Sequence, residues 1–200
     1  MEEKITYFEE AGTNNTEATL KLAIERAKAR GIKKMVLAST RGDTAKIAAE
    51  RLAGTGIKMV AVPWQYGFKE PGSRFPEELK AELAKKGHAV HFGTMLFHTE
   101  HFYGNETSRA MANLLRTFCQ GMKVCVEITL MATDGGHLAQ GEYVVVVAGT
   151  GRGSDTAVIA QAAPSTKIVD FHITEIICKP LQTRNAGPPP QQPPAQPEKK

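Results

Sequence analysis

The sequence predicts an α/β protein built on an open, largely parallel sheet. Short apolar runs alternate with amphipathic helical segments along most of the chain. The second and third runs have a helical segment between them, and a strand, helix and strand of this length predict a right-handed parallel crossover. The chain has 200 residues, of which 42% are hydrophobic, and this is enough for one well-packed domain.

Apolar runs and helix caps define the elements in the first three quarters of the chain. Strands are expected at residues 5–8, 35–38, 57–62, 88–92 and 143–148. Helices are expected at residues 17–30, 44–53, 76–86, 107–118 and 121–131. Polar residues 13–16 supply N-caps for the first helix, and Gly31 is a natural residue just beyond its end.

Residues 155–163 allow two interpretations. The segment is rich in alanine, which would suit a helix. Thr156, Val158 and Ile159, followed by a stop at Pro164, instead suit a strand that returns antiparallel along the edge of the sheet. We favour the strand. Residues 168–178 then alternate between apolar and polar side chains and predict a last strand.

A short polar loop with nearly the same letters follows two of the predicted strands. Each copy holds an arginine, glycines and hydroxyl side chains at the carboxyl end of its strand, where an open α/β sheet gathers its ligands. Glycine brings backbone amides close to an anion, and arginine, serine and threonine add donors. We therefore expect a site for a phosphate-bearing small molecule. The candidate residues are Ser39, Thr40, Arg41, Gly42, Asp43 and Thr44 in the first loop and Gly149, Thr150, Gly151, Arg152 and Gly153 in the second.

Each loop also has a purely structural interpretation. Asp43 or Thr44 would simply cap the helix that follows the first loop. The second loop would be a flexible hairpin turn, with Arg152 a surface charge. Capping and anion binding are compatible, because both use the free amides at the start of a helix.

Two long loops carry most of the remaining candidate residues. Residues 64–75 contain four aromatic side chains, and residues 93–105 are rich in histidine. The aromatic side chains would form apolar walls around a planar ligand, or would hold the loops to the core. His98 and His101 are the candidate catalytic residues, as proton donors. With Glu100 they also resemble part of a zinc site, but no further Cys or His lies at a supporting spacing, so we expect no metal.

Glu127 lies in an apolar helical run, where a carboxylate is costly unless it is paired. We expect it to pair with Arg109 or Arg116, or to contact a ligand.

Composition and charge exclude several classes of function. The net charge is +4, but the basic residues are dispersed and form no stripe with interleaved aromatics, so we expect no nucleic-acid partner. The three cysteines suit small buried residues in a reducing compartment. No apolar run approaches the roughly 20 residues that span a bilayer, and the acidic first residues are unlike a secretory signal. We therefore expect a cytoplasmic protein with no membrane partner.

The end of the chain differs in composition from the rest. Residues 183–200 are rich in proline and glutamine and cannot bury a core, so they predict a disordered or polyproline-like tail. The domain is therefore expected to comprise residues 1–182.

Residues 17–62, with their helix, strand, polar loop, helix and second strand, resemble the C-terminal α/β domain of pyruvate kinases. The match is closer to a stand-alone version of that domain, a family of small prokaryotic proteins. Residues 42–45, 123–128 and 152–157 fit blocks of this family. The resemblance spans roughly residues 4–180 in order and spacing. Arg41 departs from the family, in which a small residue precedes the glycine.

The resemblance implies a three-layer α/β/α fold with a mostly parallel sheet and an antiparallel edge strand. It implies a protein without pyruvate kinase activity that binds a small molecule, with flavin mononucleotide (FMN) as the cofactor and its phosphate at the loop after the second strand. Two alternatives stay open: a flavin-dependent oxidoreductase and a regulatory module that senses a phosphorylated metabolite. A homo-oligomer is compatible with each of the three.

Overall fold

A computed structural model describes residues 2–182 of the chain, and the predicted proline-rich tail at 183–200 lies outside the described residues. The strands are β1 (Thr6–Phe8), β2 (Lys34–Ala38), β3 (Lys58–Val62), β4 (Ala89–Val90), β5 (Tyr143–Ala148), β6 (Thr156–Gln161) and β7 (His172–Pro180). The α-helices are α1 (Thr16–Ala29), α2 (Asp43–Leu52), α3 (Glu77–Lys85), α4 (Glu100–Tyr103), α5 (Thr107–Arg116) and α6 (Gln120–Asp134). Short 3₁₀ turns are η1 (Thr13–Asn15), η2 (Leu96–His98) and η3 (Ser165–Asp170).

All described strands form one sheet in the order β1-β7-β6-β5-β2-β3-β4. Strand β6 runs antiparallel to β5 and to β7, and every other neighbouring pair is parallel. The predicted mostly parallel sheet is therefore confirmed, as is the strand favoured for residues 155–163. The antiparallel strand is not outermost, because β7 and β1 extend the sheet beyond it.

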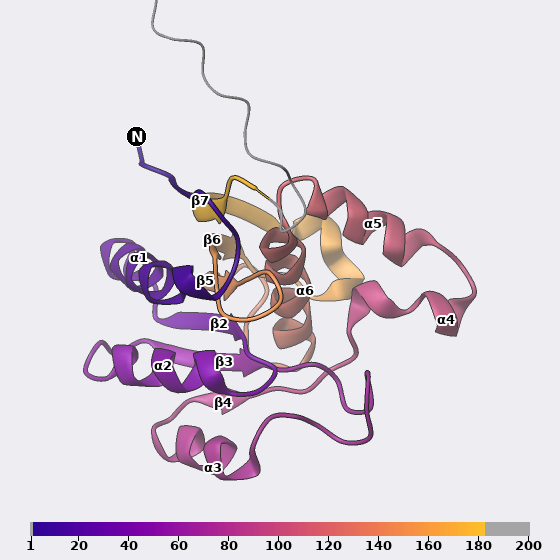
Figure 1. Cartoon of the computed structure of the whole chain (residues 1–200), viewed down its shortest axis with the longest axis horizontal. Helices are drawn as coiled ribbons and strands as arrows, with labels where there is room; N and C mark the ends of the chain where they lie inside the picture. The colour runs from indigo at the N-terminus through magenta and orange to yellow at the C-terminus, as the bar shows by residue number, and fades with distance from the viewer. Residues whose placement is uncertain (1, 183–200) are drawn as a thin grey trace, which may run out of the picture.

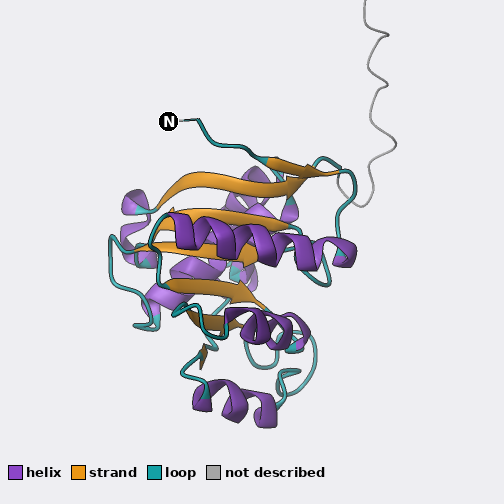
Figure 2. Ribbon diagram, turned by 90° about the vertical axis from the view of Figure 1, so that its left-hand side faces the viewer, coloured by secondary structure: helices purple, strands orange, loops and turns teal. Residues whose placement is uncertain are grey.

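Helices cover both faces of the sheet, so the predicted three layers are confirmed (Figures 1 and 2). Helices α1, α2 and α3 pack on one face through a core that includes Leu20, Leu52 and Leu83. Helix α6 packs on the other face through Met122 and Ile128, and α5 lies outside it. The alternation of side chains along β5 and β6 explains this division. Val145 and Val147 face the first layer, whereas Val144 and Val146 face α6.

Strand β4 is shorter than the five residues that the sequence predicts. The amide of Met59 donates to the ring Nδ1 of His88 at 3.1 Å rather than to a backbone carbonyl. Ala89 and Val90 pair with β3, and the His91 amide then donates to the Ala61 carbonyl at 2.9 Å. A histidine side chain thus replaces one rung of the ladder.

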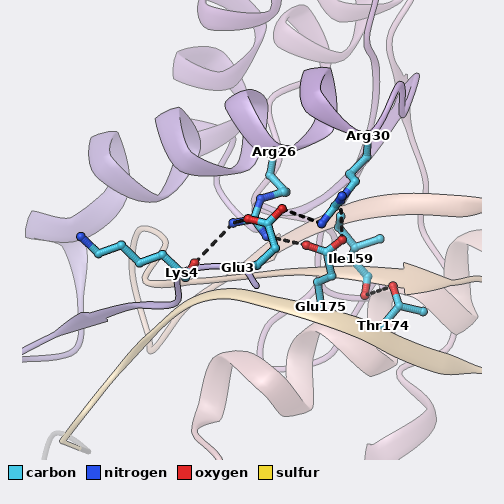
Figure 3. Close-up of polar contacts among 7 residues, drawn as sticks. All are labelled: Glu3, Lys4, Arg26, Arg30, Ile159, Thr174 and Glu175. Atoms are coloured by element: carbon cyan, nitrogen blue, oxygen red, sulfur yellow. Dashed lines mark hydrogen bonds and ion pairs between the residues drawn. The ribbon is translucent and has the colours of Figure 1, made fainter. Parts of the chain in front are cut away.

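An ion-pair network fastens β7 and the first residues of the chain to helix α1 (Figure 3). Arg26 and Arg30 both bind the carboxylate of Glu175, and Arg30 Nε lies 2.6 Å from its Oε1. The same arginines bind Glu3 at 3.1 and 2.7 Å. Burial raises the pKa of Glu175, but its hydrogen bonds to Arg30 and Arg26 outweigh burial and lower it below its usual value. The network thereby attaches the β1–β7 edge of the sheet to α1.

Candidate ligand site

The two polar loops leave the same end of the sheet from neighbouring strands. Strands β2 and β5 are parallel partners, with Leu37 opposite Val147. The chain after β2 continues into α2, whereas the chain after β5 turns back into β6. The carboxyl ends of parallel strands are where α/β proteins bind ligands. The structure thus places the predicted loops at one edge; their assignment to ligand binding stays a prediction.

The first loop forms the start of helix α2. Ser39 is buried, and its Oγ accepts a hydrogen bond from the amide of Ala45 at 3.1 Å. Gly42 has φ +87°, a conformation that favours glycine, and a Cβ there would lie 2.4 Å from Cδ2 of the flexible Leu79 side chain, which would have to shift. Within residues 2–182, the backbone amides at positions 41–44 donate to no other group of the chain. These amides are therefore hydrogen-bond donors without an acceptor at the N-terminal end of α2.

The second loop is bound by the chain's own side chains. Asp155 is fully buried, and its Oδ2 accepts from the amides of Gly12 at 2.9 Å and Thr150 at 3.1 Å. The amide of Ser154 donates to Thr16 Oγ1 at 3.0 Å. Arg152, in contrast, is exposed. A carboxyl group of the protein therefore occupies the position that an anionic ligand would take at these amides.

A cavity of about 270 Å³ lies beside the first loop, between the ends of β2 and β3, the loop after β3 and helix α6. Thr40 belongs to both the loop and the cavity wall. The apolar part of the wall includes Val62, Pro63, Trp64, Phe68, Met95 and Ile128. The polar part comprises Thr40, Lys69, His98, Gln120, Lys123 and Glu127. An apolar pocket with a few convergent polar groups is the usual form of a small-molecule site.

The polar part of the wall contains a buried ion pair. Lys123 Nζ contacts Glu127 Oε2 one helical turn away, and both side chains are at most 3% exposed. Lys123 Nζ also lies 3.0 Å from His98 Nε2, and Glu127 Oε1 accepts from the amide of Phe97 at 2.8 Å. We call Lys123, Glu127 and His98 the polar cluster. Every member is held by at least one other group of the protein.

Burial shifts the titration of the polar cluster. Desolvation lowers the pKa of Lys123, and the carboxylate of Glu127 only partly opposes this change. Desolvation also lowers the pKa of His98, and the Lys123 ammonium lowers it further. These shifts favour the neutral form of the His98 ring, and in the tautomer protonated at Nδ1 its Nε2 would accept a hydrogen bond from Lys123 Nζ.

The structure separates the two histidines that the sequence offered as catalytic candidates. His98 lines the cavity, whereas His101 lies exposed on α4 and is not part of the cavity wall. Glu127 is paired, as expected, but the partners expected from the sequence were wrong. It binds Lys123 of its own helix instead of Arg109 or Arg116, because residues four apart lie on the same face of a helix.

The aromatic residues of the two long loops divide in the same way. Trp64 and Phe68 line the cavity in an edge-to-face pair with centroids 5.3 Å apart. Tyr66 packs outside it against Phe92, at 4.6 Å between centroids. Phe102 and Tyr103 are largely exposed. The wall expected from the sequence therefore consists of Trp64 and Phe68.

Two further observations concern metals and membranes. Among residues 2–182, no group of three or more His, Cys, Asp and Glu side chains is placed to hold a metal ion. None of the helices in that part of the chain combines the length and the apolar character that crossing a membrane requires.

Comparison with known families decides the relationship. Residues 17–160 match the family described as pyruvate kinase, alpha/beta domain. The chain belongs to this family. The resemblance that the sequence suggested is thereby confirmed. The matched segment begins in α1 and ends in β6, so it includes both polar loops, the cavity and the polar cluster.

Part of this chain is similar to solved pyruvate kinases at low identity. A pyruvate kinase from Cryptosporidium parvum is 15% identical, with a TM-score of 0.39 over 74% of this chain and 23% of its own. Another structure, the pyruvate kinase of that organism in complex with ADP, is 16% identical, with a TM-score of 0.36 over 72% and 22%. The alpha/beta domain described here thus spans less than a quarter of the length of either protein.

Proposed function

We propose that this pyruvate kinase alpha/beta domain binds a phosphate-bearing small molecule at the start of α2, with FMN as the first ligand to test. The observation that carries the proposal is the position of Thr40. This residue belongs to the loop with unpaired amides and also lines the aromatic cavity. A ligand with its phosphate at the amides can therefore extend directly into the cavity.

The start of α2 has the features of a phosphate site. Unpaired amides and the helix dipole both favour negative charge at a helix N-terminus. The exposed guanidinium of Arg41 is available as a further donor. Asp43 is also exposed at this end, and its carboxylate is directed to solvent or to a ligand hydroxyl in our proposal. The amides of the second loop are less suitable, because the Asp155 carboxyl already binds one of them.

The cavity supports a planar body for the ligand. Trp64 and Phe68 offer aromatic faces, and Lys69 Nζ lies 5.0 Å from the Trp64 ring centroid. Lys69 is exposed and adds positive charge beside the cavity. The isoalloxazine ring of FMN is planar and apolar on both faces, and such rings pack well against aromatic walls.

A second candidate function is a flavin-dependent reaction, and the position of His98 favours it. His98 lines the cavity and is the one sequence-derived catalytic candidate that does so. Because burial and Lys123 lower its pKa, His98 would act there as a proton acceptor rather than as the proton donor that the sequence suggested. Reduction of the bound flavin by a nicotinamide donor would separate this function from simple binding.

Absorption spectra and titrations test the proposal. The purified protein is expected to bind added FMN, seen as the visible absorption of flavin that stays with the protein. It is expected to bind riboflavin, which lacks the phosphate, more weakly. At 100 times Kd, bound FMN would stabilise the fold by about 2.7 kcal/mol, which a thermal melt detects.

Two matched arginine variants locate the phosphate. Arg41→Ala is expected to weaken FMN binding by roughly 1.5–3 kcal/mol, the range for a hydrogen bond to a charged group. Arg152→Ala removes the equivalent arginine of the second loop and is expected to leave the affinity unchanged. Equal affinities for FMN and riboflavin, or a loss in Arg152→Ala alone, would contradict a phosphate site at α2.

A further inference from the structure

We infer that the polar cluster and Gln120 form a recognition site for an uncharged carbonyl group on a planar heteroaromatic ring. This inference deepens the proposed function, because it specifies the end of the ligand that lies farthest from the phosphate. The inference rests on the proposed function only for the position of the phosphate. The cavity, its donors and its walls do not depend on the proposed function.

Lys123 has one more hydrogen-bond donor than the described residues accept from. An ammonium group carries three N–H donors. Glu127 Oε2 accepts one and His98 Nε2 accepts another. In the described part of the chain no third acceptor is present, and the nearest ring, Phe97, has its centroid 5.5 Å from Nζ. Lys123 borders the cavity although its side chain is only 1% exposed, and in our inference the remaining N–H donates to a ligand that sits against it.

Gln120 contributes a second donor to the same cavity. Its Oε1 accepts from Arg116 Nε at 2.8 Å, which fixes the orientation of the side-chain amide. Its Nε2 group then donates to no other side chain or carbonyl among residues 2–182. Gln120 and Lys123 lie three residues apart on α6, and both line the cavity. The helix thus offers a ligand two donors that no described residue accepts from.

The charge of the cluster selects an uncharged acceptor. Lys123 and Glu127 neutralise each other, and His98 is uncharged when it accepts from Lys123. A ligand carboxylate or phosphate at the polar cluster would lie beside the Glu127 carboxylate, because the further lysine of the wall, Lys69, belongs to the loop after β3 and packs against Trp64 and Phe68. A carbonyl oxygen accepts hydrogen bonds from both donors and adds no net charge. The inferred group is therefore a carbonyl, not an acid.

The remaining wall and the volume define the body of the ligand. Trp64, Phe68, Met95 and Ile128 surround the donors with apolar surface. The volume of about 270 Å³ is near the lower end of the range for small-molecule pockets. A flat ring system with ring carbonyls, such as a pyrimidinedione, satisfies both the walls and the donors.

The buried pair is difficult to explain by stability alone. Removing two charges from water costs several kcal/mol per ion, and apolar residues of similar volume often replace such pairs without loss of stability. Lys123 and Glu127 are nonetheless almost completely buried and border a cavity. A role in ligand recognition accounts for their position.

The test uses the full chain and three small probes. Uracil and riboflavin carry ring carbonyls, whereas indole is planar and has no acceptor oxygen. The double variant Lys123→Met with Glu127→Gln removes the donor and leaves no unpaired buried charge. Binding of uracil and riboflavin, measured by calorimetry or ligand-observed NMR, is expected to fall about tenfold, the loss for a hydrogen bond from a charged donor. Indole binding is expected to be unchanged.

Two further variants keep the test decisive. Gln120→Leu leaves the ion pair intact and is expected to weaken uracil binding severalfold, so it serves if the double variant does not fold. Lys85→Met removes an exposed lysine of α3, on the opposite face of the sheet, and is the control for a lysine-to-methionine change. Its affinity for every probe is expected to equal that of the wild type.

The outcomes separate the inference from the proposed function. No binding of uracil or riboflavin to the wild type, equal binding to the double variant, or tighter binding of benzoate than of uracil would each overturn the inference. If FMN binding depends on Arg41 but not on Lys123, the phosphate site stands and the carbonyl site fails. If riboflavin binding depends on Lys123 and Arg41→Ala changes nothing, the carbonyl site stands and the phosphate site fails.

Discussion

The loop after β2 and the loop after β5 share an arginine, a glycine, an aspartate, a threonine and an alanine in the same order, and they leave the same edge of the sheet. One begins a helix with unpaired amides, and the other begins a strand and is tied to η1 and α1. The second loop has one additional residue, Ser154, before its aspartate. The aspartate is exposed in the loop without this additional residue and buried in the loop that has it.

An internal carboxyl group can accept the hydrogen bonds that a bound anion would otherwise accept. Asp155 binds amides that lie far apart in the chain, those of Gly12 and Thr150. Asp43, at the start of α2, is exposed and accepts no hydrogen bond from the described residues. The first loop therefore has amides without an acceptor among the described residues, as our proposal requires, whereas amides of the second loop bind Asp155 and Thr16.

Replacement of each aspartate by alanine is expected to produce the largest difference in stability between the two loops. Asp155→Ala leaves the buried amide of Gly12, the half-buried amide of Thr150 and the Thr156 hydroxyl without their acceptor, and should lower the free energy of unfolding by about 3 kcal/mol or more. Asp43→Ala removes only a favourable charge at a helix N-terminus, worth about 0.3–1 kcal/mol. Urea unfolding measures both. Similar losses in the two variants would contradict the distinction between the loops.

The glycines of the two loops should differ by a smaller amount. Gly153 has φ +70°, and a Cβ there would lie 2.7 Å from the Thr13 backbone, which cannot move aside. At Gly42 the obstacle is the end of the flexible Leu79 side chain. Gly153→Ala should therefore cost about 3 kcal/mol and Gly42→Ala roughly 2 kcal/mol.

Gly54→Ala is the control for these glycine variants. Gly54 also has a positive φ, +71°, but no atom lies within 4 Å of the position of its Cβ. It should show only the conformational strain, about 1 kcal/mol. If all three variants lose the same stability in thermal melts, close packing is not what requires glycine in the two loops.

The two serines provide the finest comparison. Ser39 Oγ accepts from the Ala45 amide, so Ser39→Ala should cost about 1 kcal/mol, as for other helix caps. Ser154 is buried, and its Oγ has no partner among the described residues. Ser154→Ala should therefore be neutral or stabilising by up to about 1 kcal/mol. Denaturation of both variants under one condition checks this; a cost in Ser154→Ala as large as in Ser39→Ala would show that its hydroxyl has an important partner.

Much of the fold was accessible from local sequence patterns. The valines at 144–147 predict a buried strand, and they occupy the centre of the sheet as β5. Residues 155–163 were ambiguous, because alanine suits a helix and β-branched residues suit a strand. The strand forms because the side chains of β6 alternate between two helical layers, with Ile159 on one face and Val158 on the other.

The site was less accessible, because its key contacts are not local. The hydrogen bond from Gly12 to Asp155 spans 143 residues of sequence, and no pattern in either segment indicates it. Lys123 was missed as a site residue, although its spacing of four residues from Glu127 in an apolar helix is a signal for a buried ion pair. That such a pair would border a cavity depends on the loop at 64–75, whose path the sequence does not specify.

The most direct test is an NMR titration of the amides in both loops. Addition of FMN or inorganic phosphate to ¹⁵N-labelled protein should shift the amide signals of residues 41–44 and leave those of Gly12 and Thr150 unchanged, because Asp155 already binds the latter pair. Shifts confined to the second loop, or none in either loop at saturating FMN, would contradict the assignment of the phosphate to the start of α2.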